Sequence, residues 1–287
     1  MQVSKAGDGV ADIAGWRGVH LFHFGMSSCS QKVRLHLRLK GIPWTGHLVD
    51  LASHENYGPD FLAINPRGMV PVLVLDGAVY TGSNAIIALL EERFAEPCLI
   101  PPEQREEISA LLAAEDALHH DLRHLSFRFV HGRTGSTKTP ALMEAYRKGG
   151  GLDAEKQSEI AFYERLARTG LDDATCLASA LRFRAAFEGL EARLADHPFL
   201  LGDTLTVIDI AWFVYAYRLT LGGYPLEALH PRLHAWFEGR RAVPGWEDEV
   251  APPPALAGKI AAIRAQQQAE GMTMAHLMGT SHRILGL

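Results

Sequence analysis

Three serines and a cysteine stand together at residues 27–30, between a short apolar run and a long basic segment. The apolar run at residues 21–24 is typical of a strand, and Gly25 indicates the turn that ends it. If a helix begins at these small polar residues, its first backbone N–H groups have no partners inside the helix, and its dipole favours negative charge. Hydroxyl groups in such a position could hold a thiolate.

The segment that follows, residues 32–40, has two interpretations. Basic and apolar side chains alternate with a period of two, which by itself predicts a strand. The leucine, lysine and arginine content favours a helix instead, and a serine makes a good helix N-cap. The local pattern leaves both open.

Length, charge and cysteine content bound the class of protein. The 287 residues suit two ordinary domains, and 47% hydrophobic residues supply enough side chains for a core. A net charge of -5 with dispersed Lys and Arg argues against a nucleic-acid-binding face. The three cysteines form no CxxC pair and favour a reducing compartment, so we expect a cytoplasmic protein. Residues 1–18 have no apolar run long enough for a signal peptide or a membrane span and are expected to form a loose tail.

A strand, a hairpin and a helix are expected after the opening unit. Residues 44–51 predict a second strand, and two apolar runs joined by Asp76 and Gly77 predict a β-hairpin. The hairpin follows the motif NPRGMVP at residues 65–71. Ser83 occupies the N-cap position ahead of apolar residues at helical spacing.

Strand signals nearly vanish beyond a proline-rich linker at residues 97–102. Helical patterns cover residues 108–125, 183–194, 205–221 and 256–270. Thr206 and Asp209 have the spacing of a capping box at the start of the third of these helices. The chain therefore predicts an α/β part followed by an all-α part.

These motifs, in this order, resemble the glutathione S-transferase superfamily. Residues 19–94 are similar to its thioredoxin-like domain, and residues 103–246 are similar, more loosely, to its all-helical domain. The SSCS motif followed by Val33 and Arg34 resembles the zeta-class signature, while SQKVRL at residues 30–35 also resembles the ganglioside-induced differentiation-associated relatives. The resemblance implies a thioredoxin-like domain at residues 19–97 and a helical bundle domain at residues 103–287.

The resemblance also implies a glutathione site in the first domain. Ser27 matches the residue that contacts the glutathione sulfur, and its hydroxyl would lower the thiol pKa from about 8.5. Val70 and Pro71 match a cis Val-Pro pair whose first residue pairs with the cysteinyl backbone of glutathione. Ser83 matches the serine that binds the γ-glutamyl carboxylate. The implied glutathione-binding residues are Ser27, Ser28, Val70, Pro71, Ser83 and Asn84.

Two departures from the family pattern bear on function. The residue before the anion-binding serine is commonly acidic or an amide and meets the γ-glutamyl ammonium, but here it is Gly82, so a contact of about 1 to 3 kcal/mol is missing. Residues 127–171 form a long insertion, and the chain extends past residue 254. An enlarged aromatic pocket would suit the bacterial β-aryl etherases of this superfamily, which act on lignin-derived aromatic dimers and are sometimes two-subunit enzymes.

Four histidines between residues 119 and 131 suggest a metal site. Arg123 and Arg128 among them would oppose a cation, so no metal is expected, and a pocket wall or interface is the favoured interpretation. Phe127, Phe129 and Tyr146 are candidate aromatic residues for such a wall.

Three further features of the sequence each have a functional interpretation and a structural one. Cys29 could be a redox nucleophile, but it falls two positions after the matched site, so a packed cysteine is favoured. Residues 132–139 lack the adjacent Gly-Lys pair and preceding strand of a phosphate-binding loop, so a plain loop is favoured. Met272, Met274 and Met278 could line a substrate site, although filling gaps in a core is the more common use of methionine.

The main functional hypothesis is a cytosolic transferase in which glutathione thiolate attacks an electrophilic carbon of a hydrophobic, aromatic substrate, with β-aryl ethers as one candidate class. The competing hypothesis is a non-catalytic partner subunit or scaffold, motivated by Gly82 and the insertion. A thiol-disulfide reductase that uses Cys29 is a third. The resemblance implies a homo- or heterodimer with a chain of the same fold, and neither nucleic acid nor a membrane is an expected partner.

Overall fold

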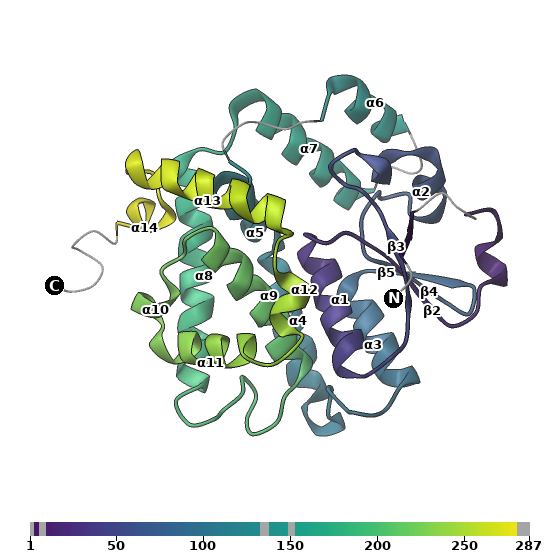
Figure 1. The fold of residues 1–287 in the computed structure, drawn as a ribbon, viewed down its shortest axis with the longest axis horizontal. Helices are drawn as coiled ribbons and strands as arrows, with labels where there is room; N and C mark the ends of the chain where they lie inside the picture. The colour runs from purple at the N-terminus through teal and green to yellow at the C-terminus, as the bar shows by residue number, and fades with distance from the viewer. Residues whose placement is uncertain (1–2, 6–9, 133–137, 149–152, 280–287) are drawn as a thin grey trace. The chain divides into compact units, whose positions relative to one another are not determined.

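The computed structural model describes residues 3–5, 10–132, 138–148 and 153–279 (Figure 1). The chain divides into two compact units. The first contains Met1–Pro97 and Gly135–Gly170, and the second contains Cys98–Thr134 and Leu171–Leu287. The division expected from the sequence counted the insertion with the helical domain, whereas most of it belongs to the first unit. The reason is apolar packing of residues 142–163 on Tyr57 and Leu62.

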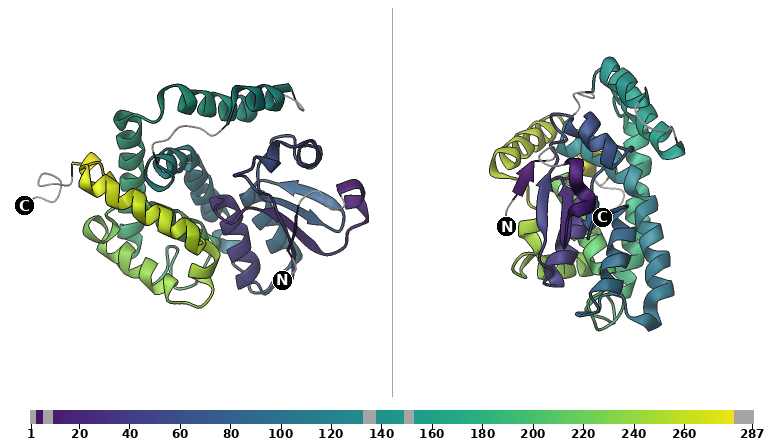
Figure 2. Two further views of the ribbon diagram at one scale, coloured as in Figure 1. Left: turned by 45° about the horizontal axis from the view of Figure 1, so that its top comes forward. Right: turned by 90° about the vertical axis from the view of Figure 1, so that its right-hand side faces the viewer.

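A five-stranded mixed sheet forms the centre of the first unit (Figure 2). Its spatial order is β1 (Val3–Lys5), β3 (Thr45–Leu48), β2 (Val19–His23), β4 (Val72–Leu75) and β5 (Ala78–Thr81). Strands β1 and β2 run parallel to β3, whereas β4 runs antiparallel to β2 and β5. The hairpin expected at Asp76 and Gly77 is confirmed. The expectation of a loose tail is wrong for β1 and for η1 (Val10–Gly15), because β1 pairs with β3 and extends the sheet.

Helices cover both faces of this sheet. They are α1 (Ser28–Leu39) and α3 (Ser83–Arg93) on one face and α2 (Pro59–Ile64) on the other. The unit also contains η2 (Glu55–Tyr57), α6 (Pro140–Lys148) and α7 (Ala154–Thr169), which share an apolar cluster with Leu62 of α2. The helix interpretation of the basic segment is thus confirmed for α1. Phe22 on β2 packs with Phe61 of α2, while α1 and α3 pack together on the other side of the strands (Figure 1).

Histidines lie on both faces of β2 and β3. On one face, His20 Nδ1 lies 3.1 Å from His47 Nε2, and the ring of Trp16 stacks 4.7 Å from that of His47. Burial, helped by His20, lowers the pKa of His47 to about 4. On the other face, burial, followed by Arg34 and His47, lowers the pKa of His23 to about 4. Both imidazoles are therefore neutral in the folded chain near pH 7.

We expect acidification from about pH 7 to about pH 5 to destabilise the first unit. Because the folded pKa values of His23 and His47 lie below the ordinary value of 6.5, the unfolded chain binds more protons. Stability present above pH 6.5 is then lost as the pH falls toward 4, by about 1 to 2 kcal/mol per histidine at pH 5. Urea unfolding at both pH values measures this loss. The double variant His23→Gln/His47→Gln should reduce the pH dependence without abolishing it, because burial also lowers the pKa values of His36 and His131. The variant His197→Gln, at an exposed histidine, should keep the full pH dependence. Equal loss of stability in the double variant and the wild type would contradict the assignment.

The second unit is built from helices over its described residues. They are η3 (Pro102–Gln104), α4 (Arg105–Ala117), α5 (His119–Leu125), η4 (Ser126–Val130), α8 (Asp173–Arg193), α9 (Val207–Leu221), α10 (Leu226–Leu229), α11 (Pro231–Arg241), α12 (Trp246–Val250), α13 (Pro254–Ala269) and α14 (Met274–Leu277). The single helix expected at residues 108–125 is instead two helices, α4 and α5, followed by the π-helical turn η4. Helix α9 is almost entirely buried and forms the centre of this unit.

The capping box expected at the start of α9 is confirmed. The carboxylate of Asp209 is fully buried and accepts hydrogen bonds from the backbone N–H of Leu200 and Thr206, at 3.1 and 3.0 Å. It also accepts from Thr206 Oγ1 at 3.3 Å and from Trp236 Nε1 at 3.1 Å. Burial raises the pKa of this carboxyl, and the four donors oppose that shift. Asp209 therefore joins the start of α9 to the preceding loop and to α11.

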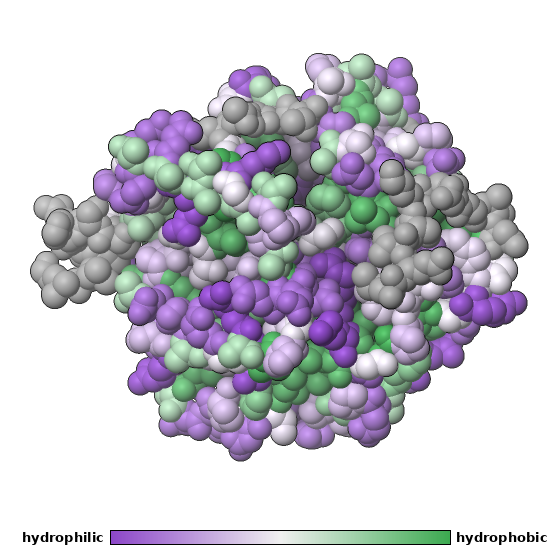
Figure 3. Space-filling view, in the orientation of Figure 1, coloured by the Kyte–Doolittle hydropathy of each residue, from purple (hydrophilic) through white to green (hydrophobic). Residues whose placement is uncertain are grey.

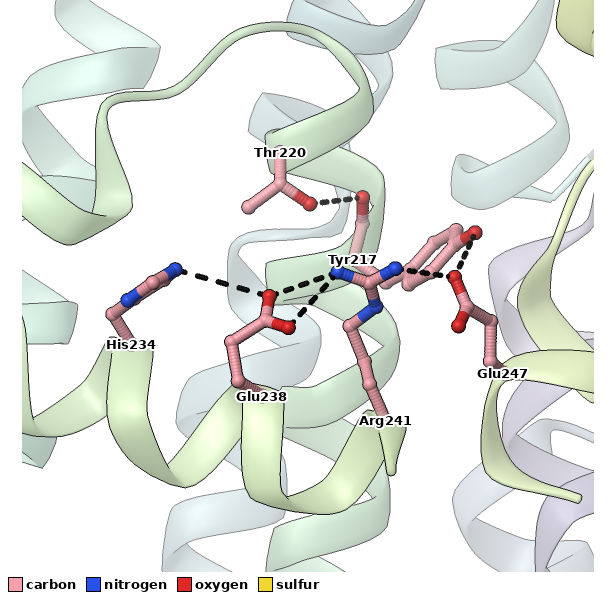
Figure 4. Close-up of polar contacts among 6 residues, drawn as sticks. All are labelled: Tyr217, Thr220, His234, Glu238, Arg241 and Glu247. Carbon is pink, nitrogen blue, oxygen red and sulfur yellow. Dashed lines mark hydrogen bonds and ion pairs between the residues drawn. The ribbon is translucent and has the colours of Figure 1, made fainter. Parts of the chain in front are cut away.

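A second polar group ties α9 to α11 and α12 (Figure 4). The guanidinium of Arg241 donates to Glu238 at 2.8 Å and to Glu247 at 2.6 Å. The hydroxyl of Tyr217 donates to the same Glu247 oxygen at 3.4 Å. Burial, followed by the charge of Glu247, raises the pKa of Tyr217 to about 12, so this phenol stays protonated and acts as a donor. These side chains therefore form a network with a structural role.

Hydrophilic and hydrophobic residues are interspersed on the surface drawn in Figure 3. Val79, Leu181 and Val243 are large apolar side chains that lie exposed, and each stands on a different element or turn. Isolated apolar exposure of this kind is ordinary for folded proteins. Within the described part of the chain, no helix combines the length and the apolar character that crossing a membrane requires.

Candidate functional site

Ser27 is the N-cap of α1, with extended backbone angles and a half-buried side chain. Its Oγ accepts a hydrogen bond from the backbone N–H of Ser30 at 3.3 Å. The same hydroxyl donates to the backbone carbonyl of Val70 at 3.5 Å. The structure therefore brings the first of the clustered hydroxyls beside Val70, while Ser28 is buried in the first turn of the helix.

The turn before Ser27 is held by side chains of α1. Ser30 Oγ accepts from the backbone N–H of Phe24 at 3.4 Å, and Arg34 donates to the Phe24 carbonyl at 3.2 Å. The carbonyl of Gly25 accepts from Gln31 at 3.0 Å and from Arg34 at 3.3 Å. These bonds fix the path of the chain into Ser27, and the sequence motif alone does not reveal them.

The segment before Val70 is fixed at three successive carbonyls. Tyr146 Oη donates to the carbonyl of Arg67 at 2.5 Å, Asn56 Nδ2 donates to that of Gly68 at 2.7 Å, and Asn65 Nδ2 donates to that of Met69 at 2.8 Å. Gly68 has a φ of 62°, and a Cβ there would lie 2.9 Å from the carbonyl oxygen of Asn56, so only glycine fits. The cis peptide bond between Val70 and Pro71 follows directly.

Ser83 is the first residue of α3 and is buried, but it is not the N-cap that the sequence predicts. The N-cap is Gly82, whose φ of 83° is a conformation that residues with side chains rarely adopt. This backbone angle gives a physical reason for the glycine. The side-chain oxygen of Asn84 accepts from Lys32 Nζ at 2.8 Å, and Lys32 is 1% exposed, so the start of α3 is joined to α1.

The sheet register shows how these parts relate. Phe22 near the end of β2 pairs with Val72 at the start of β4, and Val72 pairs with Thr81 at the end of β5. The turn into Ser27, the segment that carries Val70, and the start of α3 therefore leave the sheet at the same edge. A hydroxyl, a helix N-terminus and an extended backbone segment adjoin there, which suits an extended peptide carrying a thiol and a carboxylate.

Two of the histidines considered as metal ligands contact other side chains. His119 Nδ1 lies 3.2 Å from Tyr215 Oη, while His124 Nδ1 lies 3.0 Å from Ser179 Oγ. Burial, followed by Arg218, lowers the pKa of His131 to about 4. Among the residues that the structure describes, no group of three or more His, Cys, Asp or Glu side chains could hold a metal ion.

The structure shows the burial and packing of several residues singled out from the sequence. Cys29 is half-buried and is not joined to another cysteine. Tyr146 is fully buried in the first unit, so the expectation that it lines a pocket wall is wrong. Met274 and Met278 are buried, with exposures of 0% and 2%, which agrees with a packing role. Part of the loop expected at residues 132–139 lies outside the described residues.

A thioredoxin-like unit with a hydroxyl at its first helix N-terminus, followed in sequence by an all-helical unit, defines a class of glutathione-binding proteins. The glutathione S-transferase N-terminal domain model matches residues 26–93, and the C-terminal domain model matches residues 164–239. Glutathione S-transferase 1 of Dianthus caryophyllus is 32% identical over 187 residues, which cover 63% of this chain and 83% of that protein. The chain belongs to the glutathione S-transferase family, whose co-substrate is glutathione.

Two bacterial proteins are similar over most of this chain. The tetrachloro-p-hydroquinone reductive dehalogenase of Sphingobium chlorophenolicum is 27% identical over 252 residues, which cover 81% of this chain and 99% of that protein. The crystal structure of the β-etherase LigF from Sphingobium sp. strain SYK-6 matches with a TM-score of 0.64 at 24% identity, covering 81% of this chain and 98% of that chain. The second likeness shows the fold. It agrees with the thioredoxin-like and all-helical fold expected from the sequence.

Proposed function

We propose that this glutathione-dependent transferase uses the thiolate of bound glutathione to attack an electrophilic carbon of a hydrophobic aromatic substrate. The observation that carries the proposal is the Ser27 hydroxyl, which caps α1 and lies 3.5 Å from the Val70 carbonyl. In this proposal Ser27 donates to the thiolate, and Val70 pairs with the cysteinyl backbone. Ser83 and Asn84, at the N-terminus of α3, bind the γ-glutamyl carboxylate, while Ser28 and Pro71 shape the adjoining walls.

The hydroxyl and the helix N-terminus act on the same charge. A donor aimed at the sulfur and the dipole of α1 both favour the thiolate over the thiol, so the thiol pKa falls below its free value of about 8.5. The sulfur then forms a C–S bond with the substrate carbon. The leaving group departs with the electron pair of the broken bond, as a halide or an aryloxide, and the product is a glutathione thioether.

The substrate class is inferred from chemistry that two similar proteins share. One is named for dehalogenation of a chlorinated hydroquinone and the other for ether cleavage. Both names describe cleavage of a bond between carbon and an electronegative atom, chlorine in one and oxygen in the other. We therefore propose haloaromatics and β-aryl ethers as the first substrates to examine, with β-aryl ethers of lignin-derived aromatics as the more specific candidate.

A glutathione-dependent activity screen of the purified full chain tests the proposal. The panel contains haloaromatics, aryl ethers, maleyl-type isomerisation substrates and disulfides, and each reaction is followed with and without glutathione. We expect thioether formation with release of halide or phenol from members of the first two groups. Turnover of disulfides alone, abolished in Cys29→Ser, would instead establish the reductase.

The competing function is a non-catalytic partner subunit or scaffold, and one observation favours it. Gly82 supplies no side chain for the γ-glutamyl ammonium of glutathione. Calorimetry with glutathione separates the two functions, because the transferase requires measurable binding by the isolated chain, whereas a scaffold does not.

We also propose that the chain forms a homodimer or a heterodimer with a chain of the same fold. The proposal follows from family membership. Light scattering of the purified chain should give about twice the mass of the single chain if the homodimer forms, and the monomer mass would favour a heteromeric partner.

A further inference from the structure

A hydroxyl of the insertion contacts the segment that leads into the candidate site. Tyr146, on α6, donates from its Oη to the carbonyl of Arg67 at 2.5 Å, although the two residues are 79 positions apart in the chain. Arg67 lies three residues before Val70. The insertion therefore touches the same segment whose Val70 carbonyl accepts from Ser27.

We propose that the α6–α7 insertion is a positioning element for the glutathione site, with Tyr146 as its positioning residue. This inference rests on the proposed binding role of Val70. Tyr146 acts by holding residues 67–69 in the path that presents the Val70 backbone to the tripeptide. It does not itself touch glutathione or the reacting atoms.

Tyr146 is rigidly placed by its own surroundings. Its side chain is 0% exposed, and its ring lies 4.4 Å from that of Tyr57, between centroids. Met143 and Ile160 pack in the same apolar cluster, with Leu62 of α2 at its edge. The ammonium of Lys156 on α7 lies 4.5 Å from the Tyr146 ring centroid. A hydroxyl carried on such a fixed ring makes a stable anchor for a loop carbonyl.

A second contact links the insertion to the same residue. The guanidinium of Arg67 lies 3.0 Å from the carboxylate of Asp153, which is the N-cap of α7. The pair is about half exposed, so its contribution is small beside that of the buried hydroxyl bond. Tyr146 of α6 therefore binds the backbone of Arg67, and the N-cap of α7 binds its side chain. Both contacts come from residues of the insertion.

The position of the insertion gives these contacts a functional consequence. Asn56 and Asn65, which hold the next two carbonyls, belong to the first 97 residues of the chain. Tyr146, which binds the first of the three carbonyls, lies outside those 97 residues, in the insertion. Removing its hydroxyl leaves the Arg67 carbonyl without this donor, and the segment 67–70 gains freedom that binding of glutathione must then remove.

The variant Tyr146→Phe tests the inference, because it keeps the ring in its apolar cluster and deletes the hydroxyl. We expect the Kd for glutathione to rise about 3- to 10-fold, with kcat at saturating glutathione within about twofold of the wild type. Backbone hydrogen exchange, measured by mass spectrometry without glutathione, should rise about 3- to 10-fold in peptides covering residues 65–72. Exchange in α3 and in β3 should stay unchanged.

Arg147→Gln is the matched control. Arg147 neighbours Tyr146 on α6 and pairs with Glu144 and with Glu164 of α7, so the variant weakens the insertion at its surface and leaves the Arg67 contact in place. We expect its glutathione Kd and its exchange at residues 65–72 to match the wild type.

Unchanged exchange at residues 65–72 in Tyr146→Phe would overturn the inference, even if glutathione binds normally. Equal rises in both variants would also overturn it, since general loosening of the insertion would then be the cause. Absence of glutathione binding by the wild type would instead refute the proposed function. The exchange experiment would still decide, in that case, whether Tyr146 holds the loop.

Discussion

Replacing Ser27 by alanine is expected to raise the pKa of the bound thiol by about 1 to 2 units and to lower kcat at neutral pH by about 10- to 100-fold. The reason is the loss of the one hydroxyl that the structure places at the N-terminus of α1 beside Val70. The dipole of α1 remains, so the residual activity should stay above the rate with free glutathione. Steady-state kinetics and the ultraviolet absorbance of the thiolate measure the two effects.

The control for this prediction must separate chemistry from helix capping. Ser27 also accepts from the backbone N–H of Ser30, so alanine removes a cap that contributes about 1 kcal/mol to stability. Ser27→Thr keeps a hydroxyl in the capping position and should retain most of the activity. Cys29→Ala should be fully active with electrophilic substrates. Wild-type turnover and thiol pKa in Ser27→Ala would show that backbone amides, and not the hydroxyl, stabilise the thiolate.

Replacing Asp209 by alanine is expected to destabilise the chain by about 3 to 5 kcal/mol. The carboxylate is 0% exposed and accepts four hydrogen bonds from the backbone of Leu200, from Thr206 and from Trp236. Alanine leaves these buried donors without their acceptor and breaks the capping box of α9. Urea unfolding followed by circular dichroism gives the change in the free energy of unfolding.

A matched surface substitution controls for the loss of a carboxylate. Asp203 lies six residues earlier, and its side chain is 83% exposed, so Asp203→Ala should change stability by no more than about 0.5 kcal/mol. A similar small effect in Asp209→Ala would mean that the second unit does not depend on this network.

The first helix shows why hydropathy pattern alone was ambiguous. The alternation of basic and apolar residues in α1 is typical of a strand with one polar face. In the structure, Lys32, Arg34 and His36 are all buried within a helix. Each has a specific partner: Lys32 bonds to Asn84, Arg34 to the Phe24 and Gly25 carbonyls, and His36 Nε2 lies 2.8 Å from Glu91. Because α1 buries these polar residues beside its apolar ones, hydropathy alone does not distinguish its buried positions from its exposed ones.

The candidate site was predictable to the extent that it lies in short motifs. Ser27 and the Val70-Pro71 pair stand in contiguous segments, and the structure places the Ser27 hydroxyl beside Val70. The supporting contacts are different, because Tyr146 meets Arg67 only through tertiary packing of the insertion. No local pattern marks that tyrosine as a partner of the loop. The N-cap of α3 was missed for a backbone reason, the positive φ of Gly82.

The pKa of glutathione bound to the wild-type chain tests the central claim most directly. Titrating the thiolate absorbance of the complex between about pH 5 and 9 gives this value, and free glutathione measured in parallel gives the reference of about 8.5. We predict that the bound thiol titrates at least one unit below the free thiol, because the Ser27 hydroxyl and the α1 N-terminus both favour its charged form. A bound thiol that titrates with the free one, or a chain that binds no glutathione, would contradict the account.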